Sequence, residues 1–459
     1  DNPVAAVIDL DGGGCRVPWR VEQCGEQRQR QRDHDDRRDQ QEVDAAHHMH
    51  PFTDANGLAA KGARIIKSAK GVYLTDSEGQ QIIDGMAGLW CVNIGYGRKE
   101  LAEVAARQME ELAYYNTFFQ TTHVPAIALA AELAKIAPEG MNHTFFAGSG
   151  SEANDTNIRL VRRYWQVKGQ PEKRVIIARK NGYHGSTMGG GSLGGMSPIH
   201  AHGGKIDGIH HIDQPDWWSE GGDMTPEEFG LARARQLEDA IKEIGIDKVA
   251  AFIGEPIQGA GGVIVPPATY WPEIQRICDK YGILLIFDEV MTGFRVALGG
   301  AQALYGIRPD LTTLGKIIGG GLPVGAYASS AEIMSKVSPE GPVYQAGTLS
   351  GNPVAMSAGI AQLKECLKPG FYENLKAKTD FMVNAINEYA AGKNYGFHIF
   401  SVGSIFWLSF GFAESIRSMK EINAEEVKRF APLHAALIEE GVYLGPSGYE
   451  VGFISDAHT

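Results

Sequence analysis

The sequence is poor in cysteine, has no long apolar run and carries no excess of positive charge. Five cysteines occur in 459 residues, at positions Cys15, Cys24, Cys91, Cys278 and Cys366. Because none of them forms a closely spaced pair, neither a disulfide framework nor a thiolate zinc site is expected. No apolar run approaches the roughly 18 residues that span a bilayer, and no secretory leader is recognisable. We therefore expect no membrane contact and a cytoplasmic protein.

The charge balance favours a small-molecule ligand. The chain has 43 Lys and Arg against 55 Asp and Glu, a formal net charge of −12. A surface that binds nucleic acid normally needs a basic excess, so nucleic acid is not an expected partner. With 43% hydrophobic and 21% charged residues, the composition is that of a globular enzyme.

The chain before residue 47 contains a strongly polar stretch. "GEQRQRQRDHDDRRDQQEVD" (25–44) is dense in Gln, Arg and Asp and has almost nothing to bury, and we assign residues 1–46 to one extension. Such a segment cannot bury enough apolar surface to fold, which predicts a disordered extension. The "HHMH" run at residues 47–50 is more typical of solvated histidines than of ligands, and we predict no metal site. The glycines of "GGGSLGG" (189–195) satisfy G-x-G-x-x-G, but they follow no strand, so a dinucleotide is not predicted.

From about residue 51, apolar runs alternate with amphipathic helical stretches. "RVIIA" (174–178), "VAAFIGEP" (249–256) and "LLIFDEV" (284–290) are typical of buried strands, and the apolar residues of 270–282 share one helical face. Strand, helix and strand at this spacing predict right-handed βαβ units in a mostly parallel sheet, an α/β fold. Ligands of such sheets bind at the carboxyl ends of the strands.

Two carboxylates stand at this expected edge of the sheet. Glu255 and Asp288 each end a predicted strand. A buried carboxylate is costly unless a cationic or protonated group meets it. The ligand could be that partner.

The stretch "FFAGSGSEAND" predicts an anion site. Gly148, Gly150 and Ser151 follow an apolar stretch and precede an amphipathic helix. Glycines let a ligand approach the backbone, and the free N–H groups of a helix N-terminus suit a phosphate. The same residues also fit a simple N-cap turn.

Lys316 stands between an apolar stretch and three glycines in "TLGKIIGGG". A desolvated lysine has a lowered pKa, and a neutral amine can form a Schiff base. Alone the signal is weak, because most lysines are solvated. With the anion site, Asp288 and Tyr183 in "NGYHG", it indicates pyridoxal 5′-phosphate.

Five motifs in order now resemble one family. "SGSEA", "NGYHGST", "GEPIQGAGGVIVPP", "FDEV" and "TLGK" are similar to motifs of the class III aminotransferases. The resemblance implies a fold-type-I, aspartate-aminotransferase-like structure, with a large domain built on a mostly parallel sheet and a smaller α+β domain. It implies that residues 47–115 contribute to the small domain, 116–355 form the large cofactor domain and 356–459 form the small domain, short of the family's terminal helix.

The resemblance also assigns roles. Lys316 would hold the cofactor as a Schiff base and then move a proton as general base and acid, and Asp288 would pair with the pyridinium nitrogen. Gly150 and Ser151 would bind the phosphate. The ring would lie between Tyr183 and Val290, with Glu255 near its hydroxyl edge and Thr348 reaching the phosphate of a neighbouring subunit in a homodimer. Tyr183 and Val290 also fit plain core positions, and Thr348 a helix cap.

The substrate assignment differs between the two parts of the chain. Residues of about 47–290 resemble ω-amino acid:pyruvate transaminases, whose aromatic pocket matches Trp90 and Phe118. Residues of about 291–459 resemble glutamate-1-semialdehyde 2,1-aminomutase, in which Glu450 matches a glutamate near the substrate's amino groups. We expect an aminotransferase that moves an amino group from an ω-amine or ω-amino acid to a keto acid or aldehyde. An aminomutase and an inert cofactor-binding chain are the alternatives.

Overall fold

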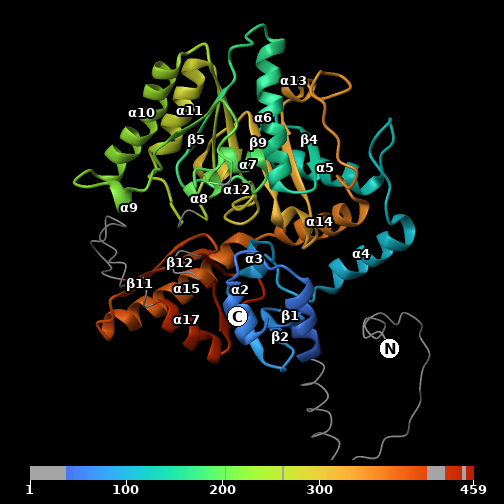
Figure 1. The fold of residues 1–459 in the computed structure, drawn as a ribbon, viewed down its shortest axis with the longest axis vertical. Coiled ribbons are helices and arrows are strands. Elements are labelled where there is room, and N and C mark those ends of the chain that lie inside the picture. The colour runs from blue at the N-terminus through green and yellow to red at the C-terminus, as the bar shows by residue number, and fades with distance from the viewer. Residues whose placement is uncertain (1–37, 202, 261–262, 411–429, 447–450) are drawn as a thin grey trace, which may run out of the picture. The chain divides into compact units, whose positions relative to one another are not determined.

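The computed structural model describes residues 38–201, 203–260, 263–410, 430–446 and 451–459 (Figure 1). The backbone forms two compact units. The smaller comprises Asp1–Ser68 with Thr75–Gln81, and the larger comprises Ala69–Leu74 with Ile82–Thr459. The predicted domain boundaries near residues 47, 115 and 355 stay predictions. In the described part of the chain, no helix is both long and apolar enough to cross a membrane.

The smaller unit begins with a helix over residues 38–47. This helix differs from the disordered extension expected over residues 1–46, and its Gln, Glu, Arg and Ala residues are good helix formers. The rest of the expected extension lies outside the described residues. A second helix, α2 (Ala55–Lys61), begins at Asp54, whose carboxylate accepts hydrogen bonds from the amides of Asn56 and Gly57.

The strands β1 (Ile66–Lys70), β2 (Tyr73–Asp76) and β3 (Gln81–Asp84) form a sheet with β13 (Val442–Tyr443) in the order β1-β2-β3-β13. A tight turn joins β2 and β3. Gly79 has φ 82°, which suits glycine, and its amide donates to the Asp76 carbonyl at 3.1 Å. The Asp76 carboxylate closes the turn by accepting from the amides of Glu78 and Gln80, each at 2.9 Å.

The larger unit is built around a seven-stranded sheet with the order β4-β10-β9-β8-β7-β5-β6. Only β10 runs antiparallel to its neighbours, so the sheet is mostly parallel, as predicted. The strands are β4 (His143–Ala147), β5 (Val175–Arg179), β6 (Ile209–Ile212), β7 (Val249–Gly254), β8 (Leu284–Asp288), β9 (Leu311–Gly315) and β10 (Gly325–Ser329). The three strands that the sequence predicts are β5, β7 and β8.

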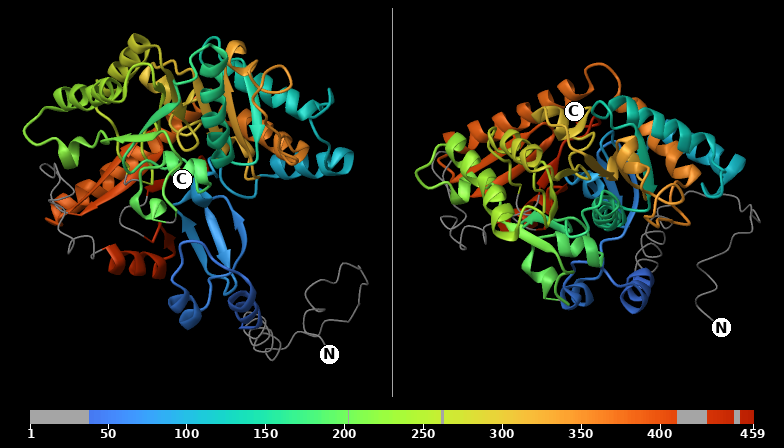
Figure 2. Two further views of the ribbon diagram at one scale, coloured as in Figure 1. Left: turned by 45° about the horizontal axis from the view of Figure 1, so that its top comes forward. Right: turned by 90° about the horizontal axis from the view of Figure 1, so that it is seen from above.

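Helices cover both faces of this sheet (Figures 1 and 2). Side chains alternate along a strand, so Leu284 and Ile286 pack in the core with α6 (Gly150–Val167), whereas Leu285 and Phe287 pack with α10 (Pro226–Ile244) and α11 (Tyr270–Tyr281). Burial on both faces explains why β8 reads as a continuous apolar run. The predicted helix 270–282 is confirmed as α11, and it joins the parallel strands β7 and β8.

The remaining elements form the ends of the larger unit. At the β4 edge, α5 (Val124–Ile136) and α14 (Pro353–Cys366) pack around η2 (Lys316–Gly319), and α4 (Lys99–Leu112) contacts α14. The antiparallel sheet β11 (Phe397–Val402), β12 (Ile405–Phe410) and β14 (Val451–Phe453) packs against α15 (Phe371–Gly392). The short helices are α3 (Ala87–Trp90), α7 (Met188–Leu193), α8 (Ser197–His200), α9 (Trp217–Glu220), α12 (Gly300–Tyr305), α13 (Ala331–Met334) and α17 (Phe430–Glu439).

Candidate active site

The carboxyl ends of β7, β8 and β9 open into a cavity of about 500 Å³, here called the strand-end cavity. Its position agrees with the expectation that ligands bind at this edge of a parallel sheet. Eight of the eleven residues predicted to form the site line it. They are Trp90, Gly150, Ser151, Tyr183, Glu255, Asp288, Val290 and Lys316.

The other three predicted residues are elsewhere. Phe118 lines a separate cavity of about 1040 Å³, so one chain does not bring it together with Trp90. Thr348 is exposed and does not line the strand-end cavity, and its carbonyl accepts a hydrogen bond from the Tyr114 hydroxyl. Glu450 lies outside the described residues.

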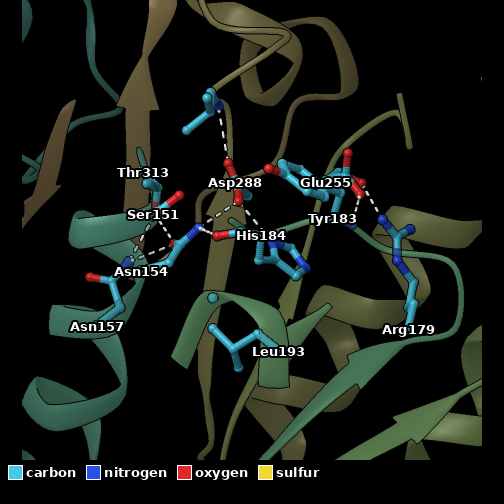
Figure 3. A network of polar contacts seen from close by, with 12 residues as sticks. Ser151, Asn154, Asn157, Arg179, Tyr183, His184, Leu193, Glu255, Asp288 and Thr313 are labelled. Carbon is cyan, nitrogen blue, oxygen red and sulfur yellow. Dashed lines mark hydrogen bonds and ion pairs between the residues drawn. The ribbon is translucent and has the colours of Figure 1, made fainter. Parts of the chain in front are cut away.

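Asp288 is the last residue of β8 and is only 4% exposed. Its Oδ2 accepts hydrogen bonds from Nδ2 of Asn154 and from Nδ1 of His184, each at 2.7 Å, and its Oδ1 accepts from the Val290 amide at 3.1 Å (Figure 3). Three donors hold one carboxylate in a fixed orientation at the cavity wall. These donors satisfy the hydrogen-bonding needs of a buried carboxylate.

A second layer of hydrogen bonds holds Asn154. Its Oδ1 accepts from the Thr313 hydroxyl at 2.8 Å, and that hydroxyl accepts from Nδ2 of Asn157 at 2.8 Å. The Nδ2 of Asn154 also donates to the His184 carbonyl at 2.9 Å. A network from α6, β8 and β9 therefore fixes the Asp288 carboxylate (Figure 3). Sequence reasoning missed Asn154 and His184, although both stand inside the quoted motifs "SGSEAND" and "NGYHG".

Lys316 follows β9 directly and has φ 49°, a conformation that is uncommon outside glycine. Its Nζ lies 4.9 Å from the ring centroid of Trp90. Burial lowers the pKa of Lys316, while the charges of Asp288 and Glu255 oppose this shift. The shift is toward the neutral amine, which is the direction that the sequence predicted for a desolvated lysine.

Glu255 follows β7 and is 6% exposed. Its Oε1 accepts from the Tyr183 amide at 2.9 Å and its Oε2 from the Gly259 amide at 3.1 Å. Burial raises the pKa of Glu255, and the nearby His184 opposes the rise. Its carbonyl accepts from a guanidinium nitrogen of Arg179, which is itself buried (Figure 3).

The N-terminus of α6 forms one wall of the cavity. Ser149 caps the helix by accepting from the Glu152 amide, and Gly150 and Ser151 follow as the first helical residues. A Cβ on Gly150 would lie 2.7 Å from a methyl carbon of Val290, so glycine is required for this close approach. Gly185 has φ 128°, and a Cβ there would lie 2.4 Å from Oγ of Ser151. The backbone amides of an 18-residue helix thus face a space that only glycines leave open.

The two adjacent carboxylates of "FDEV" serve different sites. Asp288 faces the strand-end cavity, whereas Glu289 is 1% exposed and accepts from the amides of Ala301 and Gln302 at the start of α12, at 3.0 and 2.6 Å. Burial raises the pKa of Glu289 to about 7. Glu289 therefore stabilises the start of α12 and is not among the residues that line the strand-end cavity.

Comparisons with known proteins decide the family. The family model for class-III aminotransferases matches residues 58–456. The chain belongs to the class-III aminotransferases. It is 53% identical over 345 residues to putrescine–pyruvate aminotransferase of Pseudomonas aeruginosa, covering 74% of this chain and 76% of that protein. It is 38% identical over 405 residues to glutamate-1-semialdehyde 2,1-aminomutase of Francisella tularensis, covering 86% and 87%.

A solved structure agrees with this assignment. The (S)-enantioselective omega-transaminase from Thermomicrobium roseum superimposes with a TM-score of 0.82 at 36% identity, covering 90% of this chain and 93% of that one. The predicted fold-type-I α/β architecture and the resemblance to both kinds of class-III enzyme are thus confirmed. The chain is a pyridoxal-phosphate-dependent aminotransferase.

The residues of the strand-end cavity fit this cofactor. A buried carboxylate held by three donors suits a protonated ring nitrogen, and a buried lysine with a lowered pKa suits a carbonyl partner. The helix N-terminus beside Gly150 suits a phosphate. Cys91 and Met291 also line the cavity, although no motif in the sequence points to either of them.

Proposed function

We propose that this class-III enzyme transfers an amino group from an ω-amine or diamine to a keto acid such as pyruvate, with Lys316 and Asp288 as its catalytic residues. The observation that carries the proposal is the position of the Lys316 amine, which lies in one cavity with two carboxylates and beside the Trp90 ring. The bound cofactor supplies an electron sink for the electron pair that remains when the substrate carbon loses a proton.

Lys316 is the group that moves this proton. Its lowered pKa leaves more of the amine neutral, and a neutral amine would accept the proton from the substrate carbon. Backbone strain at φ 49° supports the assignment, because strained residues cluster at functional sites. Lys316 is the first residue of η2, so this short helix holds the backbone from which the side chain extends.

Asp288 would hold a positive charge at the ring nitrogen of the cofactor. Its carboxylate is already desolvated and oriented by Asn154 and His184, so binding a cation there would cost little reorganisation. Glu255 would bind near the hydroxyl of the cofactor ring, and Tyr183 and Val290 would hold the ring between them. The amides of Gly150 and Ser151 would bind the phosphate.

The substrate side of the cavity is walled by Trp90 and Met291. Apolar walls favour the methylene chain of an ω-amine over a compact charged substrate. A relative at 53% identity is named for putrescine and pyruvate, which supports a diamine donor and a pyruvate acceptor. Phe118 and Glu450 would extend the pocket, Phe118 from the second subunit of a homodimer.

A homodimer accounts for the exposed surface around Phe118. Phe119 is 90% and Tyr344 78% exposed, and both line the larger cavity with Phe118. Exposed aromatic side chains that gather on one face mark an interaction surface. Thr348 is exposed in the same region of the chain and is free to bind the phosphate in the partner's site. We place this homodimer in the cytoplasm, without contact to membrane or nucleic acid.

The aminomutase is the second candidate, because relatives with that name align over most of the chain. Alanine formation separates the two reactions. The purified enzyme with pyridoxal phosphate, putrescine and pyruvate is expected to produce alanine. Lys316→Ala should abolish this, and Lys135→Ala, a surface lysine paired with Glu132, should not. Conversion of glutamate 1-semialdehyde without consumption of pyruvate would favour the aminomutase, and activity with neither would favour an inert chain.

A further inference from the structure

A cluster of three side chains with metal-binding donor atoms lies in the smaller unit, outside the active site. Asp44, His48 and His50 each offer one ligand atom, and these atoms all lie within 4.8 Å of one another. The class-III chemistry uses none of them. The sequence pattern alone predicts a solvated histidine run at residues 47–50, and it does not connect Asp44 to these histidines.

The local sequence explains why the three side chains converge. Asp44 and His48 are one helical turn apart, and the His48 amide donates to the Asp44 carbonyl at 2.8 Å, so both side chains share a helix face. His50 precedes Pro51, which disfavours a helical conformation at His50. The helix therefore ends before His50, and the His50 ring lies next to the Asp44 carboxylate.

The contacts in the cluster are close and centred on the carboxylate. Nδ1 of His48 lies 3.0 Å from Oδ1 of Asp44, and Nε2 of His50 lies 2.8 Å from Oδ2. The two imidazole rings are 4.4 Å apart between centroids. The Asp44 carboxylate therefore lies within hydrogen-bond distance of both imidazole rings.

We propose that Asp44, His48 and His50 bind a divalent transition-metal ion such as Zn²⁺ or Ni²⁺. Two imidazoles and a carboxylate are a ligand set that suits these ions. A tetrahedral ion with ligands at roughly 2.0–2.1 Å holds them roughly 3.3 Å apart. Measured to the single oxygen Oδ1 of Asp44, both nitrogen–oxygen distances are 3.0 Å and need to open by only a few tenths of an ångström.

Access and protonation are compatible with binding. The His48 side chain is 65% exposed, and those of Asp44 and His50 are 20% and 23% exposed. An ion can therefore reach the cluster and keep water as a further ligand. Each neutral imidazole needs only the tautomer whose proton is on the opposite nitrogen, Nε2 of His48 and Nδ1 of His50.

The experiment titrates Zn²⁺, and separately Ni²⁺, into the full-length, untagged, cofactor-loaded enzyme in competition with a chromogenic chelator. One equivalent is expected to bind to the wild type. His48→Ala and His50→Ala should each weaken binding at least 10-fold, as should Asp44→Asn, which keeps a hydrogen-bond acceptor but removes the charge. His143→Ala, which removes an exposed histidine that pairs with Asn142, is the matched control.

The cysteines are present in every variant, so metal bound to them remains in all titrations. Loss of one equivalent in the His48→Ala, His50→Ala double variant, with unchanged circular dichroism, would establish the site. Equal metal binding by wild type and double variant would overturn the proposal, and the three residues would then form hydrogen bonds only. The titration needs no turnover, so its outcome is independent of the proposed substrate.

Discussion

At the scale of single residues, the neighbouring acids Asp288 and Glu289 have different surroundings and therefore different functions. Asp288 accepts hydrogen bonds from the side chains of Asn154 and His184 and faces the strand-end cavity. Glu289 accepts from backbone amides at the start of α12 and is buried away from that cavity. The position of Asp288 at the end of an apolar strand predicted that it lies at the ligand edge of the sheet, and the structure places it there. The sequence could not predict Asn154 as its partner, since the two residues are 134 positions apart.

His184 should act as a positioning residue for Asp288. His184→Ala removes the charge-assisted hydrogen bond to Oδ2, which is worth about 1.5–3 kcal/mol, so kcat should fall about 10–100-fold. His184→Asn restores a donor near the position of Nδ1 and should recover part of the rate. Steady-state kinetics with a saturating cofactor concentration provide the measurement. Equal rates for the alanine and asparagine variants would show that the hydrogen bond does not matter.

Glu289 should make stability depend on pH. Its folded-state pKa of about 7 lies above the ordinary value of 4.5, so the folded protein keeps a proton that the unfolded chain releases between these values. The contribution to the free energy of unfolding is full below pH 4.5 and is lost as the pH rises through 7, by about 3 kcal/mol.

Thermal unfolding between pH 5 and pH 8 tests this dependence. The advantage of wild type over Glu289→Gln is expected to shrink as the pH rises, because glutamine does not titrate. Glu110→Gln, at an exposed position of α4, should behave as wild type at every pH. A constant difference between wild type and Glu289→Gln would show that Glu289 does not titrate in this range.

At the scale of elements, local patterns predicted α6, α11 and the strands β5, β7 and β8, because each carries its own periodicity or apolar run. The antiparallel direction of β10 was not predictable from the sequence. It depends on pairing with β4 and β9, and the residues of β10 itself carry no pattern that distinguishes the two directions. The convergence of α6, β8 and β9 on one cavity followed from a general rule for parallel sheets. The helix over residues 38–47 was missed because a polar composition was taken to indicate disorder.

The N-terminus of α6 should tolerate no side chain at Gly150. A Cβ would lie 2.7 and 3.2 Å from the two methyl carbons of Val290, so Val290 or the helix must shift. Gly150→Ala should weaken cofactor binding at least 10-fold in a fluorescence titration. Gly392→Ala, at the end of α15 where a Cβ would meet no atom within 4 Å, is the matched control. Unchanged affinity in Gly150→Ala would remove this helix end from the cofactor site.

At the scale of the whole molecule, one chain leaves several predicted residues apart. Phe118 and Thr348 do not reach the strand-end cavity, and α4 is amphipathic but contains no fully buried residue. Both residues would belong to the active site only if a second chain completes it, as in the proposed homodimer.

The proposed homodimer makes a direct prediction for sedimentation. The wild type should sediment with twice the mass of one chain. The double variant Phe119→Asp, Tyr344→Asp should sediment closer to the mass of a single chain, because the new charges would be buried in the interface. Phe381→Asp changes an equally exposed aromatic residue on α15 and should leave the mass unchanged. A wild type that sediments as a single chain would contradict the proposed role of Thr348.

The central claim is that Lys316 carries the cofactor, and a chemical trap tests it most directly. The cofactor-loaded enzyme is reduced with borohydride and digested, and the labelled peptide is sequenced by mass spectrometry. The expected result is one phosphopyridoxyl group on Lys316, and no label in Lys316→Ala. Stoichiometric label on another lysine, or no label in a wild type that retains the cofactor, would contradict the assignment of the strand-end cavity as the active site.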